Sequence, residues 1–113
     1  MHELSIAVAL VNQVEDVRRA NGGGKVVSVD VKVGRWQSVV PEILSGYFEH
    51  LTRGTPLEAA EIRIDSVEAT ARCRDCSEEF SVEDGFLVCP RCGALGCTLL
   101  TGDELNLVGV ELD

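Results

Sequence analysis

The chain has 113 residues, 45% of them hydrophobic, and a formal net charge of −9. This length accommodates one ordinary domain, or a small core with a metal-stabilised insert. No apolar run approaches the roughly 20 residues that a membrane-spanning helix needs. The acidity, with a pI of about 4.6, argues against binding to a nucleic-acid backbone, which depends on clustered Lys and Arg.

The chain begins with the pattern of an amphipathic helix followed by a strand. Apolar residues recur at helical spacing and predict a helix over 3–20, which the Gly-rich segment 21–24 ends. Valines then alternate with polar residues over 27–33, which predicts a half-buried strand with one polar face. The expected apolar positions are Leu4, Ala7, Val8, Val11 and Val14 in the helix and Val27, Val29, Val31 and Val33 in the strand.

A second helix and a second strand precede the cysteines. Ser38 is a candidate N-cap, Pro41 falls in the permissive first turn, and Gly54 ends the helix. Its apolar face is expected at Ile43, Leu44, Tyr47, Phe48 and Leu51. Strand signals follow at Ile62, Ile64, Val67, Ala69 and Ala71, and a last strand is expected at Leu105, Leu107, Val110 and Leu112.

Two CxxC pairs, Cys73–Cys76 and Cys89–Cys92, carry the most specific chemistry of the chain. Twelve residues separate the pairs. Each CxxC turn directs two thiolates at one point, and two such turns close a tetrahedral four-sulfur cage, which is typical of structural zinc. Phe80, Val82, Phe86 and Val88 are expected to pack in this zinc ribbon, with Pro90 and Gly93 shaping its second turn.

Three other uses of these cysteines compete with structural zinc. Disulfides are favoured in secreted domains, and the N-terminus shows no basic segment or cleavage site of a secretory signal. A redox CxxC is usually a single pair, and iron accepts the same four-sulfur geometry as zinc. Structural zinc is the favoured interpretation. Cys97 is left over and is expected to be a small buried hydrophobe.

These elements predict an α+β fold of two helices packed on a small three-stranded sheet, with an inserted four-cysteine zinc ribbon. Residues 1–70 form the α/β domain, which 98–113 complete as its last strand, and residues 71–97 form the ribbon. Zinc is expected to stabilise the insert, which is too small to bury enough surface alone.

The first residues, Met1-His2-Glu3, permit a second kind of metal site. The terminal amine, the main-chain nitrogen of His2 and its imidazole can chelate one metal after the amide loses its proton. Ni(II) and Cu(II) favour such square-planar nitrogen sites, whereas zinc has no planar preference. The alternative is that His2 is an ordinary surface residue at the start of a helix. His50, the other histidine, is expected to be a surface or groove residue.

The chain resembles the HypA/HybF family over essentially its whole length. The resemblance rests on the opening MHELSIA, the strand VDVKVG, the segment RGTPLEAAEIRI, the two CxxC pairs and the closing GDELNLVGVELD. It implies a cytoplasmic nickel metallochaperone of [NiFe]-hydrogenase maturation. It places nickel at His2, with Met1 and Glu3 contributing, and structural zinc at Cys73, Cys76, Cys89 and Cys92.

The resemblance also implies partners. These are a HypB-type GTPase, the hydrogenase large subunit and, in some organisms, urease maturation proteins, with a monomer–dimer equilibrium allowed. The chain lacks the longer ribbon insertion of archaeal relatives and has no histidine beside its zinc cysteines, which argues against a Cys-to-His ligand exchange. No nucleophile–base pair or phosphate loop stands out, so no enzyme activity is expected. The alternative function is a zinc-ribbon adaptor without nickel transfer.

Overall fold

The computed structural model describes residues 2–83 and 86–113, with His2 described by its backbone alone. The chain divides into two compact units. The first comprises Met1–Lys32, Val39–Asp65 and Asn106–Asp113, and the second comprises Val33–Ser38 and Ser66–Leu105. Within the described residues, no helix combines the length and the apolar character needed to cross a membrane.

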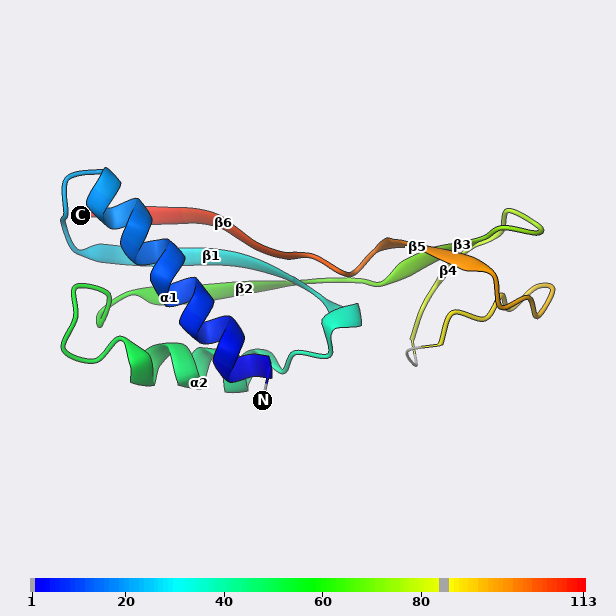
Figure 1. The fold of residues 1–113 in the computed structure, drawn as a ribbon, viewed down its shortest axis with the longest axis horizontal. Helices are drawn as coiled ribbons and strands as arrows, with labels where there is room; N and C mark the ends of the chain where they lie inside the picture. Colours follow the sequence, from blue (N-terminus) through cyan, green and yellow to red (C-terminus); the bar gives the residue numbers. More distant parts are fainter. Residues whose placement is uncertain (1, 84–85) are drawn as a thin grey trace. The chain divides into compact units, whose positions relative to one another are not determined.

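The first unit is built from two helices and a three-stranded sheet. α1 packs against α2, and the strands lie in the order β2-β1-β6, so the last strand of the chain pairs with the first (Figure 1). This arrangement confirms the predicted α+β class. The elements are α1 (His2–Ala20), β1 (Val26–Gly34), α2 (Pro41–Leu51), β2 (Glu61–Val67) and β6 (Leu105–Leu112).

The second unit contains the five cysteines and a separate sheet. Its three strands are β3 (Thr70–Cys73), β4 (Glu79–Ser81) and β5 (Cys97–Thr101), in the order β4-β3-β5. Both pairings are antiparallel, with Ala71 opposite Phe80 and Cys73 opposite Cys97. The strand signal expected to run from Ile62 to Ala71 is therefore divided between two sheets. Only β6 of the segment 98–113 joins the first sheet.

The buried face of α1 differs from the predicted one. Ala7, Leu10 and Val14 are buried as part of the core, while Leu4 and Val8 are 39% and 43% exposed. Glu3 lies on the same stripe as the buried residues and is only 8% exposed. Its Oε2 accepts a hydrogen bond of 3.3 Å from the backbone N–H of Val40. This contact with the start of α2 lies on the face of α1 that carries Leu10. Leu4 and Val8, which belong to the predicted face, are turned toward solvent instead.

The register of β1 also departs from strict alternation at its start. Val29, Val31 and Val33 are buried as predicted, but Val27 is 43% exposed and Ser28 is 1% exposed. The Ser28 hydroxyl lies 3.4 Å from Oε1 of Glu111 on β6. The buried hydroxyl therefore has a polar partner, which reduces the cost of placing it inside.

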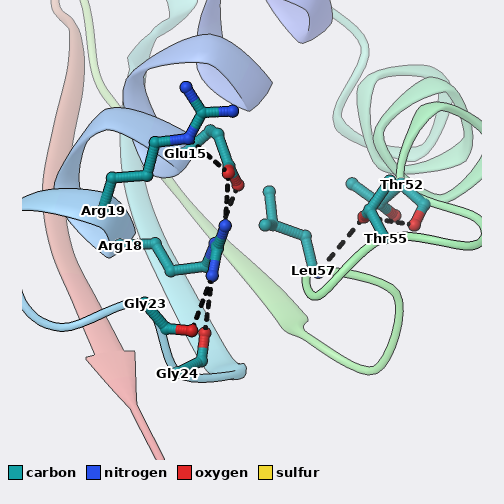
Figure 2. Close-up of polar contacts among 8 residues, drawn as sticks. All are labelled: Glu15, Arg18, Arg19, Gly23, Gly24, Thr52, Thr55 and Leu57. Carbon is teal, nitrogen blue, oxygen red and sulfur yellow. Dashed lines mark hydrogen bonds and ion pairs between the residues drawn. The ribbon is translucent and has the colours of Figure 1, made fainter.

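Hydrogen bonds from Arg18 connect the end of α1 to the turn that follows it (Figure 2). Its Nε donates to Glu15 at 2.9 Å, and its Nη1 donates to the carbonyls of Gly23 and Gly24 at 2.7 and 3.4 Å. The carbonyls of this turn thus obtain a donor from a side chain of the helix they terminate. Gly23 adopts a φ of 78°, in the left-handed region that favours glycine.

The approach to α2 does not use the predicted cap. Ser38 ends a short 3-10 helix, η1 (Arg35–Gln37), with a φ of 55°, and Val40 occupies the N-cap without a side-chain bond. Pro41 lies at the first position of the helix as predicted. Leu44 and Phe48 are buried, whereas Ile43 is 45% exposed.

A second set of polar contacts orders the segment after α2 (Figure 2). The Thr55 hydroxyl donates to the carbonyl of Thr52 at 2.6 Å and accepts from the N–H of Leu57 at 3.2 Å. Thr52 and Leu57 are each 1% exposed. The Thr52 carbonyl and the Leu57 N–H are therefore hydrogen-bonded within this turn, and the side chain of Leu57 is buried in the core.

The core of the second unit forms around its cysteines. Phe80, Val82, Leu87 and Ala94 pack against the buried residues Ala71, Cys73, Cys89 and Cys97. The predicted packing of Phe86 and Val88 is wrong, because these side chains are 68% and 41% exposed. Residues 86–88 lie in no strand, so no alternation indicates which of them points inward.

Three chain segments approach closely at Gly34, Ala69 and Gly102, all in the second unit. A Cβ at Gly34 would overlap the carbonyl of Gly102, and one at Gly102 would overlap Cα of Ala69. The N–H of Gly34 donates to Glu104 at 2.7 Å, and the N–H of Trp36 donates to Gly102 at 2.8 Å. Backbone packing at this crossing therefore leaves no room for a side chain.

Candidate metal centre

The two CxxC turns have the same hydrogen-bond pattern. In the first, Ser77 N–H donates to the carbonyl of Cys73 at 3.0 Å, and Cys73 N–H donates to Glu78 at 2.9 Å. In the second, Gly93 N–H donates to Cys89 at 2.8 Å, and Cys89 N–H donates to the carbonyl of Ala94 at 3.0 Å. Each turn thus holds its two cysteines on the same side of a short loop.

The four sulfur atoms converge on one point. All lie within 4.8 Å of one another, and the pairs Cys73–Cys92 and Cys76–Cys89 are each separated by 3.6 Å. A tetrahedral zinc site with bonds of about 2.3 Å requires sulfur atoms about 3.8 Å apart. The donor set and its spacing therefore fit a four-coordinate metal ion such as zinc. Among residues 2–83 and 86–113, no other group of three or more ligand side chains gathers in this way.

The site is closed on one side only. Cys73 and Cys89 are 0% and 2% exposed, Cys76 is half-buried, and Cys92 is exposed. A metal held here would be anchored to the core through Cys73 and Cys89, while Cys92 would face solvent.

Backbone N–H donors act to lower the pKa of all four thiols, while burial and contacts among the sulfur atoms shift the individual values in different directions. The N–H of Cys76 lowers the pKa of Cys73 to about 7 against the opposing effect of burial, with the N–H of Asp75 assisting. For Cys89, burial alone would raise the pKa, but N–H groups of Cys92 and Arg91 lower it overall. For Cys92, the N–H of Ala94 acts to lower the pKa, yet the sulfur of Cys73 and burial raise it to about 12.

A bound dication would change this balance. Metal coordination requires thiolates, and the positive charge stabilises all of them together. The backbone N–H groups that already act to lower the pKa of each thiol would also stabilise the four thiolates of a metal-bound site.

Cys97 lies next to the centre without belonging to it. It is 8% exposed, which confirms the predicted burial, and it pairs across the strands with Cys73. Its Sγ lies 3.7 Å from the carbonyl oxygen of Ala94. Burial raises the pKa of its thiol. Cys97 therefore acts as a small apolar residue beneath the metal-binding turns.

The N-terminal candidates are described only in part. Met1 and the side chain of His2 lie outside the described residues, and the chelate expected of them stays a prediction. Glu3 is described, and its carboxylate accepts a hydrogen bond from Val40. His50 is exposed in the last turn of α2. The sequence did not indicate the Glu3–Val40 contact, because nothing in a short-range pattern pairs residues 37 positions apart.

The fold and the sulfur cluster define a class of protein: a metal-binding chain with a four-cysteine ribbon inserted in an α/β unit. A family model described as "Hydrogenase/urease nickel incorporation, metallochaperone, hypA" matches residues 1–112. The chain therefore belongs to the HypA family.

Curated relatives agree with this assignment. The chain is 42% identical to the hydrogenase maturation factor HypA of Geotalea daltonii, with 99% of each chain covered. It is 42% identical to that of Solidesulfovibrio magneticus over the full length of both, and 44% identical to that of Deinococcus radiodurans over 95% of this chain and 89% of the relative.

Solved structures share the fold. The solution structure of the Ni metallochaperone HypA from Helicobacter pylori superposes with a TM-score of 0.68 at 22% identity, covering 97% of this chain and 96% of the other. A second solution structure of a HypA protein gives 0.69 at 25% identity, covering 99% and 96%. The two-helix unit and its cysteine ribbon thus follow a known architecture.

Proposed function

We propose that this chain is a nickel metallochaperone that binds Ni(II) at its N-terminus and delivers it to the large subunit of a [NiFe]-hydrogenase. The observation that carries the proposal is the family match, which extends from the first residue to residue 112 and includes Met1-His2-Glu3. The chain transfers metal by ligand exchange and performs no catalysis of its own.

The nickel ligands are the amine of Met1, the main-chain nitrogen of His2 and its imidazole. A deprotonated amide is a strong-field nitrogen donor that favours the square-planar geometry of Ni(II). The helix starts at this point, so its dipole opposes a cation. The carboxylate of Glu3 supplies compensating negative charge close to the metal.

Glu3 also positions the nickel-binding turn. Its carboxylate accepts a hydrogen bond from Val40, at the N-cap of α2. A negative group near a helix N-terminus is stabilised by the helix dipole. We infer that this contact fixes the first turn of α1 and so presents His2 at a constant place beside α2.

Zinc is the resident metal of the four cysteines. The sulfur spacing supports a closed tetrahedral site, which is the form that structural zinc takes. We propose two functional domains: residues 1–70 with 98–113 handle nickel, and residues 71–97 form a docking ribbon whose order depends on zinc.

The partners follow from the role of the family. A HypB-type GTPase supplies the nucleotide hydrolysis that this chain lacks, and urease maturation proteins are a second class of recipient. We place the chain in the cytoplasm, where thiols stay reduced. A monomer–dimer equilibrium is part of the proposal and is checked by sedimentation.

The decisive experiment is a nickel titration of the untagged, zinc-loaded protein, in which calorimetry and visible absorption measure the binding. His2→Ala is compared with His50→Ala, the matched histidine control. We expect wild type and His50→Ala to bind one equivalent with a square-planar d–d band, and His2→Ala to lose both signals. Residues added ahead of Met1 should have the same effect as His2→Ala.

Equal nickel binding by the His2→Ala protein, or no binding by any of the proteins, would contradict the proposal. The zinc-ribbon adaptor would then be the better account. Elemental analysis of the same samples reports zinc separately, because the four cysteines are intact in every variant.

A further inference from the structure

The second unit contains a cavity of about 580 Å³ that neither proposed metal site uses. Its walls come from three segments of the unit: the η1 region, the residues between β2 and β3, and the end of β4. The residues that matter for its chemistry are Arg35, Trp36, Glu68, Ala69, Val82 and Glu83.

Trp36 gives the cavity an aromatic wall. It is the only tryptophan of the chain. Its backbone N–H donates to the carbonyl of Gly102 at 2.8 Å, which holds this residue at the crossing of the chain segments. Ala69 and Val82 add apolar surface. An indole ring at a partly enclosed site is the best natural surface for a cation–π contact.

The charges around the cavity favour a positive guest. Glu68 and Glu83 contribute two carboxylates against the single guanidinium of Arg35, which leaves a net negative site. The Ser81 hydroxyl donates to Oε1 of Glu68 at 2.5 Å and so restrains this carboxylate. A restrained carboxylate loses less side-chain entropy when it forms an ion pair.

The geometry points to a docking site for a basic side chain of a protein partner, in which the guest ammonium or guanidinium packs on Trp36 and pairs with Glu68 and Glu83. A Lys or Arg side chain combines the apolar stem and the charged head that these walls require. A metal ion is a poorer guest, because only two carboxylates line the cavity and they belong to no group of three or more ligand side chains among the described residues. The net charge of −9 steers basic partners toward the chain as a whole.

The test uses the full-length, zinc-loaded protein and a capped Gly-Arg-Gly-Arg-Gly peptide as the probe. Trp36 fluorescence and backbone amide shifts report binding at the cavity. We expect a saturable change with the arginine peptide and none with its Gly-Glu-Gly-Glu-Gly counterpart. The double variant Glu68→Gln/Glu83→Gln should bind at least about tenfold more weakly, because charge-assisted hydrogen bonds are lost.

The control variant is Glu42→Gln/Glu58→Gln, which removes two exposed carboxylates of the first unit and should leave binding unchanged. Trp36→Leu, followed by amide shifts alone, should also weaken binding. Three outcomes would overturn the proposal. The wild-type protein shows no saturable change with the arginine peptide, or the Glu68→Gln/Glu83→Gln protein binds that peptide as tightly as wild type. The third is that the wild-type protein prefers the acidic peptide and loses this preference in Arg35→Gln. None of these variants touches the cysteines or His2, so the result is independent of the nickel titration.

Discussion

Ser77 and Gly93 occupy equivalent positions in the two metal-binding turns, four residues after the first cysteine of each pair. Both have left-handed backbone angles, with φ of 65° and 76°. Their N–H groups close the two turns on Cys73 and Cys89. Glycine adopts this conformation without steric cost, whereas serine does not.

Replacing Ser77 by Gly should therefore stabilise the metal-bound ribbon, by up to about 1 kcal/mol. The measurement is chemical unfolding of the zinc-loaded protein, together with competition for zinc by a chelator. Ser66→Gly is the matched control, because Ser66 lies in β2 and glycine weakens a strand. A loss of stability in Ser77→Gly equal to that of the control would contradict the expected relief of strain.

Alanine at Gly34 should destabilise the protein by at least about 2 kcal/mol, since the new methyl group overlaps backbone that cannot yield. Gly102→Ala should behave alike, with the added strain of a φ of 106°. Gly46→Ala provides the control. Gly46 lies in α2, a methyl group there would have no neighbour within 4 Å, and alanine should add up to about 1 kcal/mol. If Gly34→Ala had the same free energy of unfolding as the wild type, the close backbone packing of Gly34 on Gly102 would be contradicted.

The ion pair at the end of α1 predicts a pH dependence. Hydrogen bonds from Arg18 lower the pKa of Glu15 to about 2 from an ordinary 4.5, against partial burial and with help from Arg19. A depressed carboxylate pKa means that this stabilisation is complete above pH 4.5 and is lost as the pH falls toward 2.

The measurement is the NMR chemical shift of the Glu15 carboxyl carbon between about pH 6 and about pH 3. The carboxyl should stay ionised over this range in the wild type, although an ordinary glutamate titrates there. Arg18→Gln should return its pKa toward 4.5. Arg53→Gln, which alters an exposed arginine elsewhere, should leave it unchanged. A wild-type Glu15 that titrates like its exposed neighbours would show that the ion pair does not persist in solution.

Cys97 and Cys73 should respond differently to replacement, although they face each other across two strands. Cys97→Ala should keep one metal ion per chain and lose about 1 kcal/mol of stability, as expected for a small change in a packed core. Cys73→Ala should lose metal and order in the second unit. Bound zinc and amide spectra separate the two cases, and metal loss in Cys97→Ala would assign this fifth cysteine a direct role.

The metal centre was the part of the molecule most accessible from sequence. The two-residue gap within each pair dictates a turn, and two turns of this kind bring four sulfur atoms together, as found for Cys73, Cys76, Cys89 and Cys92. The two α-helices were also predictable, because their apolar residues recur at a fixed period, whereas the short η1 helix and the start of α2 were not.

Features that depend on distant contacts were not predictable. Leu10 is buried in place of Leu4 on a helix whose buried stripe also carries Glu3, bonded to a residue of another segment. Leu87 packs in place of Phe86 because an irregular segment carries no period. The cavity beside Trp36 requires three segments to meet, and only the tertiary structure brings them together.

The strand order of the first sheet has a consequence for metal loading of the ribbon. Its β1 strand lies between β2 and β6, and β6 follows every strand of the second sheet along the chain. The cysteines and all three strands of the second sheet precede β6. The ribbon contains no strand of the first sheet, so its metal site does not require β6. A chain truncated after residue 104 should therefore already protect its thiols from alkylation in the presence of zinc.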